Sequence, residues 1–250
     1  MRDSKWGSPA LSRAEQEDAL SYDREQLLAN AHELELIRRL RKILGSLLTE
    51  GRHSQYPEVV GEISLLRYVR GTGHNLEKAA TVFQRHIAIR EFYNLNDVRD
   101  KYYSTMLSRP NHSVSQEELS WGETVRAYLP MTLNAPLSER GDPFNTYWYI
   151  SGRMAMLLET HGYERVMQYT MELSICRQIQ LDLLSRRKQR LARLVLIFHA
   201  PHGGIWRLAS SGPTREFFQR GNKLGYTMSS TLPSTLARSY IMNDSWGLHV

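Results

Sequence analysis

Few residues of this chain have the type and spacing that catalysis or metal binding requires. His199 and His202 lie three residues apart on either side of a turn, but a zinc site needs further nitrogen, sulfur or oxygen ligands. Cys176, the single cysteine, falls on the apolar stripe of an expected helix, where a thiol packs rather than attacks. The sequence contains no G-x-S-x-G elbow and no glycine loop long enough to cradle a phosphate. We therefore predict a protein that is not an enzyme and has no cofactor and no metal site.

The composition is that of an ordinary globular protein with a basic surface. The 250 residues are 41% hydrophobic and carry a net charge of +6, which suits one domain with a helical annex. No apolar run approaches the roughly 20 residues of a membrane span, and the N-terminus lacks a hydrophobic signal core. We expect a cytoplasmic protein, with peripheral membrane contact left open. The positive charge fits a plain solvated surface, anionic lipid headgroups or nucleic acid.

Two helices with a break between them organise the first half of the chain. The expected first helix carries Ile63, Leu66, Tyr68 and Val69, and a glycine-rich break follows it at Gly71-Thr72-Gly73. Asn75 stands at an N-cap position, and a second helix follows. Its apolar residues recur at steps of three and four, namely Leu76, Ala79, Ala80, Phe83 and Ile87. Upstream, a capping box at Ser12 to Glu15 predicts one long helix from there to about Leu48.

Strands alternate with helices in the second half, which predicts an α/β fold with a mixed or parallel sheet. We expect strands at 146–150, at 192–199 and at 239–243. Helices are expected at 117–128, from Gly162 to Ser185 or beyond, and at 213–224. The helix from Gly162 has one apolar stripe, formed by Val166, Tyr169, Leu173, Cys176 and Ile179.

The two halves together resemble the CRAL-TRIO family, which comprises lipid-transfer proteins of the phosphatidylinositol/phosphatidylcholine-transfer and retinal/tocopherol-binding type. In the helical half the resemblance rests on Leu65-Leu66-Arg67-Tyr68-Val69-Arg70, Asn75, Glu77-Lys78-Ala79, Ile89-Arg90 and Asp97. In the second half it rests on Tyr147 to Gly152, Glu164-Arg165, Glu172, Leu194 to His199 and Tyr240-Ile241-Met242-Asn243. It covers residues 57 to 250 and is stronger in the helical half.

The resemblance implies an apolar pocket between a sheet and its covering helices, with a lipid or other hydrophobic small molecule as the partner. Alternation of side chains along the expected strands then gives the pocket residues. They are Tyr147, Tyr149 and Ser151 on one strand and Val195, Ile197 and His199 on the other, with Met228 at a further position that the family implies.

Departures from the family pattern argue against a phosphoinositide ligand. Gly73 and Ser234 stand where the phosphatidylinositol-transfer branch has a lysine and a glutamate that hold the inositol phosphate. Val195 and Ile197 replace polar pocket positions, which suits a more apolar ligand. Seven residues follow Asn243, too few for the family's gate helix and last strand, so we expect a partial, C-terminally truncated lobe.

Three functions remain as hypotheses. The first is non-enzymatic binding or transfer of a lipid. The second is a protein-interaction or membrane-docking module that keeps the fold without a loaded pocket, and transient contact with an anionic membrane fits either. The third, nucleic-acid binding, is unlikely because no aromatic platform accompanies the basic runs at 38–42 and 186–193. The expected divisions are a disordered tail (1–11), an N-terminal helix and linker (12–56), a CRAL-TRIO-like helical segment (57–107), a connector (108–145) and a partial lipid-binding-like lobe (146–250).

Overall fold

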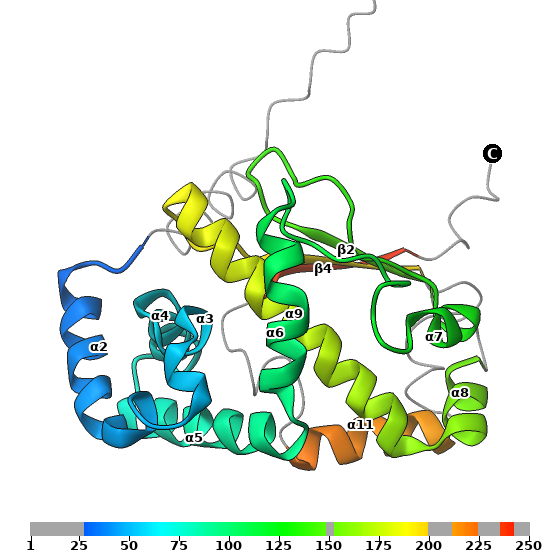
Figure 1. Ribbon diagram of the computed structural model, residues 1–250, viewed down its shortest axis with the longest axis horizontal. Helices are drawn as coiled ribbons and strands as arrows, with labels where there is room; N and C mark the ends of the chain where they lie inside the picture. Colours follow the sequence, from blue (N-terminus) through cyan, green and yellow to red (C-terminus); the bar gives the residue numbers. More distant parts are fainter. Residues whose placement is uncertain (1–27, 149–152, 200–211, 225–235, 243–250) are drawn as a thin grey trace, which may run out of the picture.

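A mixed sheet packed against a long central helix forms one half of the molecule, and a bundle of shorter helices forms the other (Figure 1). The computed structural model describes residues 28–148, 153–199, 212–224 and 236–242. Its elements in chain order are α2 (Ala31–Leu44), η1 (Gly45–Leu48), η2 (Arg52–Gln55), α3 (Pro57–Val60), α4 (Glu62–Gly71), α5 (Leu76–Phe92), α6 (Leu95–Leu107), α7 (Gly122–Tyr128), β1 (Met131–Thr132), β2 (Phe144–Trp148), α8 (Arg153–His161), α9 (Tyr163–Lys188), β3 (Leu194–His199), α11 (Gly212–Leu224) and β4 (Leu236–Met242).

The sheet has the strand order β1-β2-β3-β4. β1 runs antiparallel to β2, whereas β2, β3 and β4 are parallel to one another. The connection from β2 to β3 passes through α8 and α9, as a parallel crossover requires. The expected α/β class with a mixed sheet covered by helices is confirmed.

Helix α9 is the centre of the fold and lies between α6 and the sheet (Figure 1). From Met171 through Ser185 every one of its residues is buried. The polar ones among them bond to neighbouring segments. Gln178 Nε2 donates to the Glu58 carbonyl at 2.9 Å, and Gln180 Nε2 donates to the Asn111 carbonyl at 2.9 Å.

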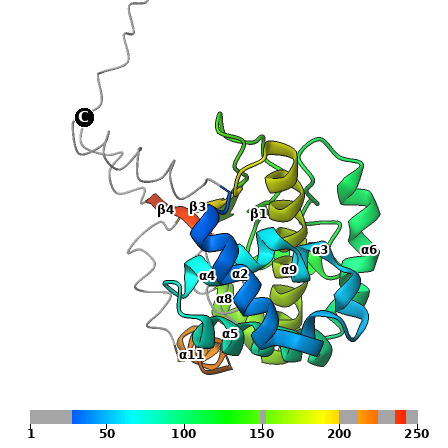
Figure 2. The same ribbon diagram turned by 90° about the vertical axis from the view of Figure 1, so that its left-hand side faces the viewer.

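The helical hairpin forms as the sequence predicts. Asn75 caps α5, and its side chain accepts a hydrogen bond from the Lys78 N–H at 2.9 Å. The apolar stripe of α5 packs against α2 and α4, and Figure 2 shows α2 in front of these helices. Arg67 on α4 crosses to the other half, where it donates to the Ala192 carbonyl at 2.7 Å and to Ser185 Oγ at 3.1 Å.

The expectation of one long N-terminal helix is wrong at its N-terminal side. Residues 28–30 are not helical, and α2 begins at Ala31 because Asn30 is an extended N-cap residue that forms a capping box with Glu33. The expected capping box at Ser12 and the tail at 1–11 lie outside the described residues. The helix ends at Leu44, before Gly45, whose φ is 51°.

The helix expected at 117–128 is confirmed only in its second half, as α7. Its first residues are turns because the chain folds back tightly at Gly122. A Cβ there would lie 1.6 Å from the Gln116 carbonyl oxygen, so only glycine fits. The other expected elements occur, and their ends within the described residues are shifted by up to three residues, whereas the expected strand ends at 150 and 243 lie outside the described residues. Helix α8 and the short strand β1 were not expected.

Lowering the pH is expected to destabilise the junction of α2 and α4. Arg70 donates two hydrogen bonds to the buried Glu33 carboxylate, at 2.7 and 2.8 Å, and these bonds together with Asn30 lower the pKa of Glu33 from 4.5 to about 2. Because the folded-state pKa lies below the unfolded one, the carboxylate stabilises the fold above pH 4.5. This contribution is lost as the pH falls from about 4.5 towards 2.

Urea unfolding of the wild type and of Glu33→Gln at pH 7, 4 and 3 measures this contribution. The difference in unfolding free energy between the two proteins is expected to shrink as the pH falls. Glu35→Gln on the same helix is the control, because Glu35 is exposed and bonds to the exposed Arg38. A Glu33→Gln difference that stays constant with pH would show that the carboxylate is not stabilised in this way.

Candidate functional site

The structure places the sequence-predicted pocket residues on two different faces of the sheet. In the parallel pairing of β2 with β3, Tyr147 is opposite Phe198, and its ring stacks on that of Phe198 with centroids 5.2 Å apart. Tyr147 therefore lies on the face towards α9. Val195, Ile197 and His199 alternate with Leu194, Leu196 and Phe198 and lie on the other face. Tyr149, Ser151 and Met228 lie outside the described residues.

The face towards α9 is filled by side chains. The Arg177 guanidinium lies 5.3 Å from the centroid of the Tyr147 ring, and its Nε donates to Asn145 Oδ1 at 3.0 Å. Burial lowers the pKa of Arg177 to about 9, so the group is still a cation at neutral pH. A buried cation and an amide at this position replace the apolar wall that a lipid chain would need.

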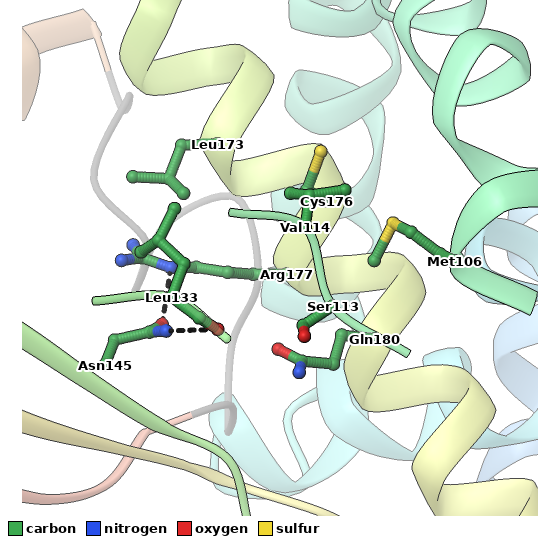
Figure 3. A pocket seen from close by; sticks show the side chains of 9 residues that line it. All are labelled: Met106, Ser113, Val114, Leu133, Asn145, Leu173, Cys176, Arg177 and Gln180. Atoms are coloured by element: carbon green, nitrogen blue, oxygen red, sulfur yellow. Dashed lines mark hydrogen bonds between the residues drawn. The ribbon is translucent and has the colours of Figure 1, made fainter. Parts of the chain in front are cut away.

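A small cavity lies between α9 and the sheet (Figure 3). Its volume is about 10 Å³, which is room for about one water molecule. The buried Ser113 Oγ at its wall has no hydrogen-bond partner among the described residues. The cavity is too small for an acyl chain. It is lined by Met106, Ser113, Val114, Leu133, Asn145, Leu173, Cys176, Arg177 and Gln180.

The opposite face of the sheet is apolar and partly accessible, and we refer to it as the outer face. Register and alternation place six residues of β2 and β3 on it, namely Phe144, Thr146, Trp148, Val195, Ile197 and His199. Val195 is buried, Trp148 is 45% exposed and the other four are half-buried. The four apolar side chains belong to none of the three hydrophobic clusters of the described residues. Among the described residues these side chains therefore pack outside the clusters that surround α9 and the helical hairpin, although Val195 is buried.

The outer face ends in a stacked pair of rings. Trp148 and His199 are the last residues of two neighbouring parallel strands, and their ring centroids lie 3.8 Å apart with an angle of 6° between the planes. Ligands of open α/β sheets commonly bind at the carboxyl ends of the strands. Phe144, Thr146 and Trp148 were not predicted, because they share a face with Val195 only through the register of β2 with β3.

Other chemically capable groups of the described residues are bonded within the fold. Glu172 Oε1 accepts hydrogen bonds from Tyr102 Oη at 2.5 Å and from the Ser120 N–H at 2.9 Å. Burial raises the pKa of the Cys176 thiol, which keeps it protonated and unreactive. No group of three or more His, Cys, Asp or Glu side chains in the described part of the chain could hold a metal ion. The expectation that Cys176 is buried is confirmed.

The basic run after residue 185 is partly tied to the fold. Arg186 Nε donates to Asp182 at 2.7 Å, Arg187 donates to the Pro110 carbonyl at 2.6 Å, and Arg190 lies 3.5 Å from Asp142. Because these side chains contact the protein itself, fewer of them are available to bind phosphate groups, which weakens the case for a nucleic-acid surface.

No protein-family model and no curated protein matches the sequence. None of the described helices is long and apolar enough to cross a bilayer.

Proposed function

We propose that this protein is a divergent CRAL-TRIO-like protein that binds or transfers a lipid without catalysing a reaction, and that the ligand lies on the outer face of the sheet. The observation that supports the proposal is the outer face itself. Its apolar side chains take no part in the hydrophobic clusters of the described residues, and two of its residues match pocket positions of the family, Val195 and Ile197.

The filled face towards α9 supports the same location. A lipid chain cannot enter the cavity of about 10 Å³ beside Arg177 without displacing a buried cation and its hydrogen bond to Asn145. On β2 and β3 the outer face contains no buried cation of this kind. From Phe144 to Trp148 it extends about 13 Å along β2, which is enough to contact a substantial part of an acyl chain. Each methylene removed from water there contributes about 0.8 kcal/mol.

The filled face towards α9 also favours a second candidate function. A protein that has kept the fold but lost its ligand would be a protein-interaction or membrane-docking module. The two functions differ in whether an apolar molecule accompanies the purified protein.

Native mass spectrometry of the full chain purified from cells separates these candidates. We expect a fraction of the protein to carry an extra mass of several hundred daltons that is lost on denaturation and is identified as lipid by organic extraction. The same protein, delipidated and then mixed with vesicles of a total lipid extract, is expected to regain this mass. A protein that stays unloaded in both experiments would contradict the carrier function and favour the interaction module.

A further inference from the structure

Among the described residues, helix α2 is covered on one side only. Its buried side packs on α4 and α5, and its other side is exposed. Figure 1 shows α2 at the left edge of the molecule, and Figure 2, which looks from that edge, shows it in front of the other helices. The exposed side chains in the second half of α2 form what we call the basic face, namely Arg38, Arg39, Arg41, Lys42 and Ile43.

The basic face has an excess of positive charge. Arg38 bonds to Glu35, and Arg41 donates to a backbone carbonyl of α3 at 3.3 Å. Arg39 and Lys42 make no hydrogen bond or ion pair with any described residue. Glu35 is the one exposed acidic residue of α2, so four exposed cations and one carboxylate give the surface of this helix a net charge of +3. Steps of three and four residues bring these cations to the same side of the helix.

The neighbouring helix α5 shows that this excess is not a general property of the helical half. Its exposed cations, Lys78 and Arg85, are matched by Glu77 and Glu91, so the exposed side of α5 has no net charge. It also ends in an exposed apolar residue, Phe92. Because both helices carry an exposed apolar side chain and differ in charge, α5 is a suitable reference for α2.

We propose that the basic face of α2 docks the protein on the anionic headgroups of a lipid bilayer. Such headgroups complement the positive excess, and each Lys or Arg near an anionic membrane surface adds to the attraction. Ile43 is 50% exposed and lies one turn after Arg39, so its side chain leaves water in the headgroup region while the cations stay with the phosphates. A nucleic-acid duplex would use the cations but would not bury the isoleucine. This inference goes beyond the proposed function because it concerns the membrane and not a bound lipid.

Flotation of the full chain with lipid vesicles measures the docking. One set of vesicles consists of phosphatidylcholine, and the other contains in addition a fraction of phosphatidylserine that is varied. We expect the protein to float with the phosphatidylserine vesicles only, and more of it to float as their anionic fraction rises. Binding is expected to disappear between about 0.1 M and 1 M salt, because the Debye length falls from about 10 Å to about 3 Å.

Variants then locate the docking surface. The double change Arg39→Gln and Lys42→Gln is expected to weaken vesicle binding about 30-fold, the effect of two cations at an anionic surface. Ile43→Ser is expected to weaken it about fivefold, because the remaining apolar side chain is no longer removed from water. The matched control is Lys78→Gln with Arg85→Gln, which removes the same charge from α5 and is expected to bind within about twofold of the wild type. All the changed residues are exposed, and thermal unfolding checks that the variants are folded.

Several outcomes would overturn the inference. Equal weakening by the two double variants would show that net charge, and not the basic face of α2, holds the vesicles. Failure to float with anionic vesicles, or equal flotation with phosphatidylcholine alone, would exclude docking on anionic headgroups. A DNA duplex that binds the wild type more tightly than the vesicles do, and binds Ile43→Ser equally well, would identify a nucleic-acid surface instead. Native mass spectrometry tests the bound lipid separately, so a loaded protein that does not float would keep the proposed function and refute this inference alone.

Discussion

Replacing Ile197 by aspartate is expected to weaken lipid binding at least about 100-fold. Ile197 lies in the middle of β3, opposite Thr146 of β2, and is half-buried on the outer face. A bound chain would cover the new carboxylate and remove it from water, which costs several kcal/mol when no partner is present. A loss of about 2.7 kcal/mol corresponds to a factor of 100 in the dissociation constant.

Laurate titration of the folded variant measures this effect, with thermal unfolding as the check of folding. Ile197→Val is the matched control: it removes one methylene and is expected to weaken binding about fourfold. Ile197→Thr, which has nearly the shape of valine with one hydroxyl, should lie between the two and is available if the aspartate variant does not fold. Wild-type affinity in a folded Ile197→Asp protein would exclude the outer face as the binding site.

Replacing Phe83 by alanine is expected to lower the free energy of unfolding by about 3–5 kcal/mol. The Phe83 side chain on α5 is fully buried, and its ring packs edge to face on Tyr68 with centroids 5.3 Å apart. Truncation leaves a cavity between α4 and α5, and the tyrosine cannot shift to fill it because its hydroxyl is hydrogen-bonded to the buried His86.

Phe92 offers a matched control on the same helix. It is 71% exposed, so Phe92→Ala is expected to change stability by no more than about 0.5 kcal/mol. Urea unfolding curves of both variants give the comparison, provided that the slopes agree with the wild type. Equal effects of the two changes would mean that α5 is not packed through its Phe83 face.

The helical hairpin could be predicted from the sequence because its signals are local. The step from Leu76 to Phe83 to Ile87, the glycine break and the Asn75 cap each act within a few residues, and the structure has α4, the turn and α5 where these signals place them. The start of α2 was misjudged although its signal, the capping box of Asn30 and Glu33, is equally local. The apolar spacing continues upstream of Asn30, and this spacing outweighed the cap in the prediction.

The surroundings of α9 could not be predicted from periodicity. The apolar stripe from Val166 to Ile179 is buried as expected, yet Arg177, Gln178 and Asp182 on the remaining faces are buried too. Their partners lie far away in the chain, such as Asn145 for Arg177 and the Glu58 carbonyl for Gln178. Polar and charged residues beside an apolar stripe are typical of a helix with one face in solvent. Full burial of α9 is favourable only because the tertiary structure supplies hydrogen-bond partners for these side chains.

The residues of the candidate site were only partly predicted, again because contacts between distant segments decide them. Alternation within one strand correctly separates Val195, Ile197 and His199 from their neighbours, but it does not show which residues of another strand share their face. That depends on the parallel register, which pairs Trp148 rather than Tyr147 with His199. Tyr147 consequently packs on the side of α9, away from the three residues with which it was grouped.

The continuous burial of α9 from Met171 to Ser185 has a consequence for dynamics. A helix enclosed on all sides has no inexpensive local opening, so its amide hydrogens should exchange with solvent only when the whole protein unfolds. If a ligand binds the outer face as proposed, α9 and the strands packed on it should stay rigid while it enters and leaves.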